Sequence, residues 1–184
     1  MKKFGRQSTT RPVAQKHDCS EVLCLAINQL NNVRAVLSGL GIRYRDLQRE
    51  PRGVGISVVW KHAGYLVLSV AGADDDLLSI TAGLLKDVRH DRSRILEICN
   101  VLTRDNAALP VYLNDETGGW DIHVQQRLRI DLLRAETDFF RACLESLPVA
   151  AIEMRSKFQE SGIKGQSYSL NGEDAQHLLL RSLA

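Results

Sequence analysis

The stretch that decides the fold runs from residue 56 to residue 84 and reads ISVVWKHAGYLVLSVAGADDDLLSITAGL. Its first and last parts alternate apolar residues with small or polar ones, the period-2 pattern of a strand with one buried face. Its middle part, residues 65–70, is apolar at nearly every position, which predicts a central strand covered on both faces. Short segments rich in glycine or aspartate separate the three parts. The stretch therefore predicts three strands joined in an antiparallel meander.

Two further strands are predicted after Pro110. Residues 111–113 form a short strand, and the polar segment 114–119 is typical of a hairpin loop. In residues 120–128, Trp120, Ile122, Val124, Gln126 and Leu128 alternate with polar side chains, as in a strand with one face buried and one face in water.

Helices are predicted on either side of these strands. The first begins near Ser20, carries an apolar stripe at helical spacing, and ends at Gly39 and Gly41. Three more helices are expected, the first from about residue 91, the second from about residue 131 with a kink or break at Pro148, and a short last one over residues 173–183. The stripe of the first helix consists of Leu23, Ile27, Leu30, Val33, Leu37 and Leu40.

The order α-βββ-α-ββ-α predicts an α+β fold with an antiparallel five-stranded sheet, three strands plus two, packed with helices. We expect helices on one face of this sheet and, on the other, side chains such as Tyr65, His123 and Gln125 open to a partner. Residues 1–17, which hold five cations and no acid, are expected to form a flexible basic tail, residues 18–160 the domain, and residues 161–184 a loop with a short C-terminal helix.

Composition narrows the function. The chain has 184 residues, 44% of them hydrophobic, and a formal net charge of only +2, so its bulk charge argues against nucleic-acid binding. Its four cysteines form no C-x-x-C pair, and three of them fall among apolar helix residues, as reduced thiols of a cytoplasmic protein do. We find no secretory leader pattern and no apolar run that approaches the ~20 residues of a membrane span, and therefore expect a cytoplasmic protein without membrane attachment.

Motifs for chemistry are weak throughout the chain. The run Asp74-Asp75-Asp76 lacks the spaced ligands of a cation loop, and Gly53-Val54-Gly55 precedes a strand instead of opening a helix. The five histidines lie in five separate segments and are each expected at the surface. We therefore predict no metal, no cofactor and no catalytic residues, and hence no enzyme, although catalytic groups can converge from distant positions.

Features suited to binding are clearer. Four aromatic residues fall in or beside predicted strands, where half-exposed rings often serve recognition, although core packing or cross-strand pairing is the stronger explanation for each one taken alone. Two apolar residues of the first helix lie off its main stripe, which favours burial on a second side, for instance in a homodimer. These candidate binding residues are Trp60, Tyr65, Tyr112, Trp120, Leu25 and Val36.

Several segments together resemble the YbjN family. The helix ending in Gly41-Ile42-Arg43-Tyr44, the helix asparagine Asn100, and the strand Val111-Tyr112-Leu113-Asn114-Asp115 are similar to the family pattern, and Trp120 to Leu147 is similar to its later strand and helix. The YbjN fold is similar to that of the CesT-like type III secretion chaperones. The resemblance implies an α+β sandwich, often dimeric and without known catalysis, that holds an extended segment of a client protein; members are also described as regulators of sensory transduction.

We therefore expect a non-enzymatic protein- or peptide-binding chaperone or adaptor, with a client protein and a second copy of the chain as its partners. The alternative is a regulatory protein that contacts nucleic acid or a signalling partner through its basic N-terminal tail.

Overall fold

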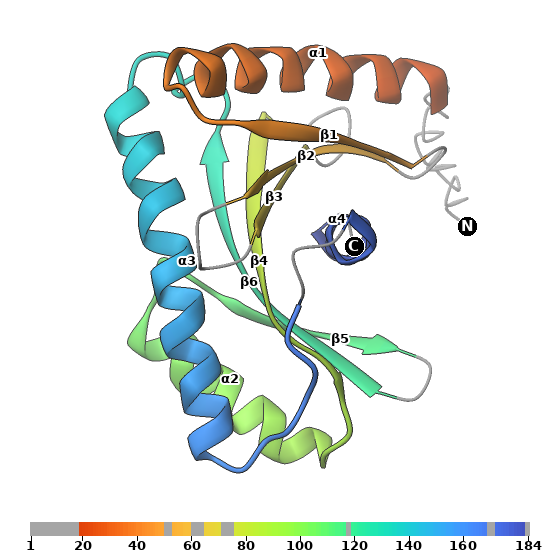
Figure 1. Cartoon of the computed structure of the whole chain (residues 1–184), viewed down its shortest axis with the longest axis vertical. Helices are drawn as coiled ribbons and strands as arrows, with labels where there is room; N and C mark the ends of the chain where they lie inside the picture. Colours follow the sequence, from red (N-terminus) through yellow and green to blue (C-terminus); the bar gives the residue numbers. More distant parts are fainter. Residues whose placement is uncertain are drawn as a thin grey trace, which may run out of the picture.

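The computed structural model describes residues 19–49, 53–59, 65–70, 76–116, 119–168 and 172–182. They form an α+β fold in which one antiparallel sheet is flanked by four helices (Figure 1). The elements are α1 (Cys19–Gly39), β1 (Tyr44–Arg49), β2 (Gly53–Val59), β3 (Tyr65–Val70), β4 (Leu77–Val88), α2 (Arg92–Asp105), β5 (Val111–Glu116), β6 (Gly119–Arg129), α3 (Thr137–Glu160) and α4 (Gly172–Ser182).

The sheet of the described residues has six strands in the order β1-β2-β3-β4-β6-β5, where the sequence predicted five. The additional strand is β1, an edge strand of sequence YRDLQR that pairs only with β2. Among its described side chains, Arg45 and Asp46 are exposed and Leu47 is buried, and the sequence YRDLQR lacks the alternating apolar residues that signal a strand. The three-plus-two grouping is also replaced by one continuous sheet, because β4 pairs with β6 along most of its length.

One face of the sheet, the helical face, packs against α1, α2 and α3 (Figure 1). The stripe of α1 is in this core, with Leu30, Val33 and Leu37 fully buried. The helix ends as predicted: Gly41 has φ of +68°, and the N–H groups of Gly41 and Ile42 donate to carbonyls of the last turn, a Schellman cap.

Helix α3 differs from the prediction at two points. It begins at Thr137 instead of Asp131, because residues 130–135 form turns that bury Ile130 and Leu133. It also continues past Pro148 without a break in its helical assignment. Pro148 itself is buried, although its ring nitrogen cannot donate the backbone hydrogen bond of a helix residue.

The other face of the sheet is covered by α4, which was predicted as a helix without a position (Figure 1). The prediction of an open second face is therefore wrong at its centre: His123 is 2% exposed and Gln125 is 3% exposed. We call this surface the α4 face; its described members are Leu47, Gly55, Ser57, Val67, Ser69, Ser79, Thr81, Gly83, Tyr112, Asn114, Asp121, His123 and Gln125.

Candidate functional site

The α4 face is made of small and polar side chains where the helical face is apolar. Strand register aligns them in rows across the sheet, for example Ser57, Val67, Thr81 and Gln125 in one row. The three polar side chains of this row are buried and form hydrogen bonds within the sheet. Ser57 Oγ donates to the Arg45 carbonyl at 3.3 Å, and Gln125 Nε2 donates to Thr81 Oγ1 at 3.4 Å. Internal bonding of this kind removes much of the cost of burying a polar group.

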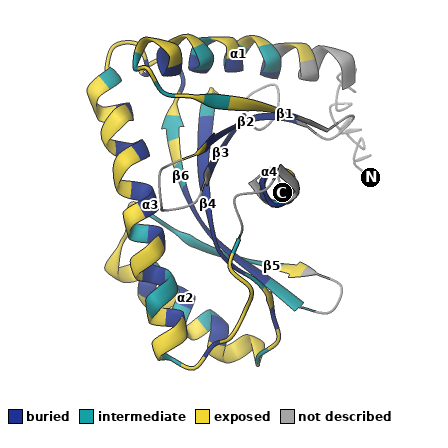
Figure 2. Ribbon diagram, in the orientation of Figure 1, coloured by how far each residue is buried: buried dark blue, intermediate teal, exposed yellow. Residues whose placement is uncertain are grey.

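Among the described residues, the buried apolar side chains of the α4 face and of α4 form one small cluster, separate from the main core. Its buried members are Leu47, Val67, Ala175, Leu178 and Leu179, with Tyr168 packed against them. Figure 2 shows α4 with buried residues on the side toward the strands. The helix is therefore seated by a few apolar side chains on an otherwise polar surface.

Two glycines create the space into which this segment fits. A Cβ on Gly55 would lie 2.5 Å from Leu179 Cδ1 and 2.9 Å from the Leu68 carbonyl oxygen. A Cβ on Gly83 would collide with the ring of Tyr168. Each glycine thus forms a notch that receives one specific side chain from the C-terminal segment.

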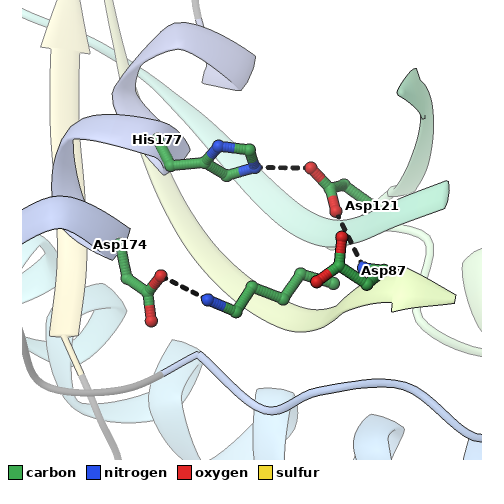
Figure 3. Close-up of polar contacts among 5 residues, drawn as sticks. Asp87, Asp121, Asp174 and His177 are labelled. Atoms are coloured by element: carbon green, nitrogen blue, oxygen red, sulfur yellow. Dashed lines mark hydrogen bonds and ion pairs between the residues drawn. The ribbon is translucent and has the colours of Figure 1, made fainter. Parts of the chain in front are cut away.

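Asp121, a buried carboxylate on β6, is a polar anchor for α4 (Figure 3). Its Oδ2 lies 2.5 Å from Nε2 of His177 on α4, and its Oδ1 accepts from the Asp87 backbone N–H at 3.3 Å. Asp87 has φ of +52°, within a β4 irregularity where register shifts against β6. The hydrogen bond to Asp121 raises the pKa of His177 above its usual value, because it favours the protonated imidazole.

Lys86 and Asp174 form a second anchor (Figure 3). Lys86 Nζ lies 2.6 Å from Asp174 Oδ1, and the two side chains are 24% and 7% exposed. The Lys86 backbone also exchanges two 2.8 Å hydrogen bonds with Gln166, which holds the connection between α3 and α4 against β4. One residue therefore fixes both the start of the connection and the first turn of the helix.

His123 sits in the next row, beside Gly83 on β4 and Tyr112 on β5. Its ring stacks on Tyr112 with the centroids 5.4 Å apart and an angle of 14° between the planes. Burial lowers the pKa of His123 to about 4, although the charge of Asp121 opposes that effect. Within the described part of the chain, its buried Nδ1 has no hydrogen-bond partner. The expectation of a surface histidine is wrong here, since the ring is 2% exposed on the face of β6 that carries Asp121.

The six predicted binding residues do not form one surface. Tyr112 belongs to the α4 face, whereas Trp120 lies on the helical side, packed against the core with the Arg92 guanidinium 5.6 Å from its ring centroid. Val36 is 8% exposed and is part of the core beneath α1. Trp60 lies outside the described residues. Tyr65 and Leu25 are in β3 and α1, but their side chains lie outside the description.

Sequence inspection missed the four residues that anchor α4, namely Lys86, Asp121, Asp174 and His177. None stands in a recognisable motif, and Asp121 and His177 are 56 residues apart in the chain. The available signal was indirect: Asp121 and His123 occupy polar positions of the alternating strand, which marked a second face without saying what covers it.

The described residues hold neither a metal-ligand cluster nor a membrane-spanning helix. No group of three or more His, Cys, Asp or Glu side chains among them is placed to hold a metal ion. Within the same ranges, none of the helices combines the length and apolarity needed to cross a membrane.

Comparison with known proteins places the fold. No protein-family model matches the chain, and no curated protein matches its sequence. Among solved structures, YbjN from E. coli, provisionally described as a transcription regulator, aligns with a TM-score of 0.51 at 15% identity, over 74% of this chain and 96% of its own. An uncharacterized protein from Methanothermobacter thermautotrophicus aligns with a TM-score of 0.52 at 13% identity, over 72% of this chain and 98% of its own. The chain has a YbjN-like fold, as its sequence indicated.

Proposed function

We propose that this chain is a non-enzymatic binding domain of the cytoplasm, a chaperone or adaptor that holds a segment of a client protein as type III secretion chaperones do. One observation carries the proposal. The α4 face accepts a short amphipathic helix by means of the notch at Gly55, a small apolar cluster and two charged anchors, and a second notch at Gly83 receives Tyr168 from the connection before the helix. A surface that recognises a peptide segment needs this combination of pockets and fixed polar groups.

The chemistry of the anchors suits binding better than catalysis. The Asp121 carboxylate is buried and already engaged by the Asp87 N–H and the His177 ring. A general base needs access to a substrate proton at hydrogen-bond distance, and this carboxylate is 1% exposed.

Site-specific photo-crosslinking tests the proposal. A photo-reactive phenylalanine analogue replaces Tyr112, which is half-buried at the β5 edge of the α4 face. The matched control carries the same group at Glu153, an exposed position of α3 on the opposite side of the sheet. We expect protein adducts in host cells at position 112, mapping to one contiguous segment of the partner, and none at position 153. Absence of adducts at position 112, or equal adducts at both, contradicts the proposal.

Self-association remains part of the proposed function. Val36, one of the two residues that suggested it, is buried in the core, so α1 no longer supplies an apolar surface through that residue. Exposed apolar side chains occur instead on α3, at Phe139, Val149 and Ile152. Light scattering after size exclusion at micromolar concentration decides the matter, because a dimer has twice the 20.6 kDa mass of the chain.

A second candidate is a regulator that contacts nucleic acid through residues 1–17, which lie outside the described residues. It is favoured by the five cations of that segment and by the description of the E. coli neighbour. Such binding weakens steeply with salt and disappears when residues 1–17 are deleted. Nucleic-acid binding that survives the deletion would exclude this role for the segment.

A further inference from the structure

Helix α4 packs on the sheet in the way that a bound peptide helix packs on a receptor. The helix has 11 residues, a length at which an isolated helix is marginal in water, so it depends on the sheet for its helical structure. Its buried apolar side chains, among those that the structure describes, belong to the small cluster with Leu47 and Val67, which is separate from the main core. The conformational entropy lost on ordering 11 residues is offset by the burial of this small cluster. We therefore place α4 among the elements that open locally before the domain unfolds.

The sheet beneath α4 is complete without it. Every strand pairs with its neighbours through registers that involve no residue of α4. The main core lies on the helical face and contains no residue of α4. Departure of α4 would expose Leu47, Val67 and the notch at Gly55, a surface that matches a second helix of the same pattern.

We propose that α4 is a built-in competitor for the α4 face, and that the partner of this face is an amphipathic helix that displaces α4 by presenting the same side chains at the same spacing. This inference rests on the proposed function and deepens it by naming the site and the chemistry of the partner. The pattern is a carboxylate followed by a small residue, with two adjacent leucines one turn later, as in Asp174, Ala175, Leu178 and Leu179. The carboxylate meets Lys86, and the second leucine enters the notch at Gly55.

The length of the connection sets the strength of this competition. Gln166 is fixed to Lys86 by two backbone hydrogen bonds, and Asp174 follows eight positions later. A short tether of this kind gives its end an effective concentration on the order of millimolar. A free peptide therefore binds the native chain poorly, and it binds well only when α4 is weakened or when its own affinity is high.

A charge swap across the Lys86–Asp174 pair tests the proposal in the full-length chain. The probe is a fluorescein-labelled peptide with the sequence of residues 169–184, followed by fluorescence anisotropy. In the D174K chain, the tethered helix is repelled by Lys86, while the native peptide still carries the matching carboxylate. We expect this chain to bind the native peptide at least about 100-fold more tightly than the native chain does, the lower end of the gain from tethering.

The K86E chain is the matched control. Its own helix is also repelled, but it should bind a peptide that carries the D174K change and reject the native peptide. A reversal of peptide preference between the two chains identifies the α4 face as the site. If neither chain binds either peptide, or if both chains bind both peptides equally, the proposal is wrong.

Hydrogen exchange on the native chain decides the matter even where a charge variant fails to fold. We expect the amides of α4 to exchange faster, by at least about 100-fold, than those of β3 and β4, because local release precedes global unfolding. Equal protection of α4 and β4 would mean that the helix is an inseparable part of the domain, and it would overturn the proposal. Crosslinking at position 112 would still report on client binding in that case, so the two proposals fail separately.

Discussion

The buried histidine of the α4 face makes the stability of this protein depend on pH in a calculable way. His123 is 2% exposed, and burial lowers its pKa to about 4 from 6.5. Between these values the unfolded chain binds a proton that the folded chain excludes, so stability falls as the pH falls from 6.5 to 4 and this histidine contributes no further loss below that. A difference of about 2.5 pH units, at 1.36 kcal/mol per unit, corresponds to a loss of roughly 3 kcal/mol.

The perturbation is His123→Phe, which removes the titrating ring and keeps an aromatic group to stack on Tyr112. Urea unfolding followed by circular dichroism at pH 7, 5.5, 4.5 and 4 gives the free energy of unfolding of both chains. We expect the native chain to lose about 3 kcal/mol more than the variant between pH 7 and pH 4. At a slope of about 2 kcal/mol per molar urea, the difference in midpoint is roughly 1.5 M. The contributions of the other carboxylates and histidines that titrate in this range are the same in both chains, so they cancel in the difference.

His177→Phe is a control of opposite sign. Its hydrogen bond with Asp121 raises the pKa of His177, so its stabilising contribution is fully present below pH 6.5 and is lost as the pH rises through the raised value. As the pH falls, the free energy of unfolding of the native chain should therefore rise relative to that of His177→Phe, and it should fall relative to that of His123→Phe. Parallel pH profiles of the native chain and His123→Phe, within about 0.5 kcal/mol, would refute the reasoning, because they would show that the ring is hydrated in the fold.

Three further predictions concern the scaffold. Phe158→Ala should destabilise the protein by about 3–5 kcal/mol, since this ring of α3 is fully buried in the main core; a loss below 1 kcal/mol in urea unfolding would contradict that packing. Gly41→Ala should cost about 1–2 kcal/mol because of its left-handed φ of +68°, whereas Gly39→Ala, at a position without that constraint, should not lower the melting temperature. Asp91→Ala should cost about 1 kcal/mol, because the Asp91 carboxylate accepts from the Arg94 N–H as the N-cap of α2; amide exchange in the first turn of α2 should accelerate, and unchanged exchange there would disprove the cap.

The elements that could be predicted from sequence are those whose pattern is local. The meander of β2, β3 and β4 follows from the alternation of apolar residues, and the end of α1 follows from Gly41, because only a residue tolerant of positive φ suits that cap. The strand β6 is equally plain, since one of its faces meets the core and the other carries polar groups. Strand β1 was not predicted because its sequence, YRDLQR, does not alternate apolar with polar residues.

What the sequence by itself determined is therefore the set of main helices and strands, the polar character of one sheet face, and a resemblance that the fold confirms. Only the tertiary structure decided that α4 lies on that face and that His177 meets Asp121 and Asp174 meets Lys86. The reason is physical. Helix and strand periodicity depends on neighbours within a few residues, but the α4 face joins side chains from all six strands of the described sheet and from the last helix. Their contacts depend on strand order, on the bulge at Asp87 and on the space left by two glycines, none of which leaves a local pattern.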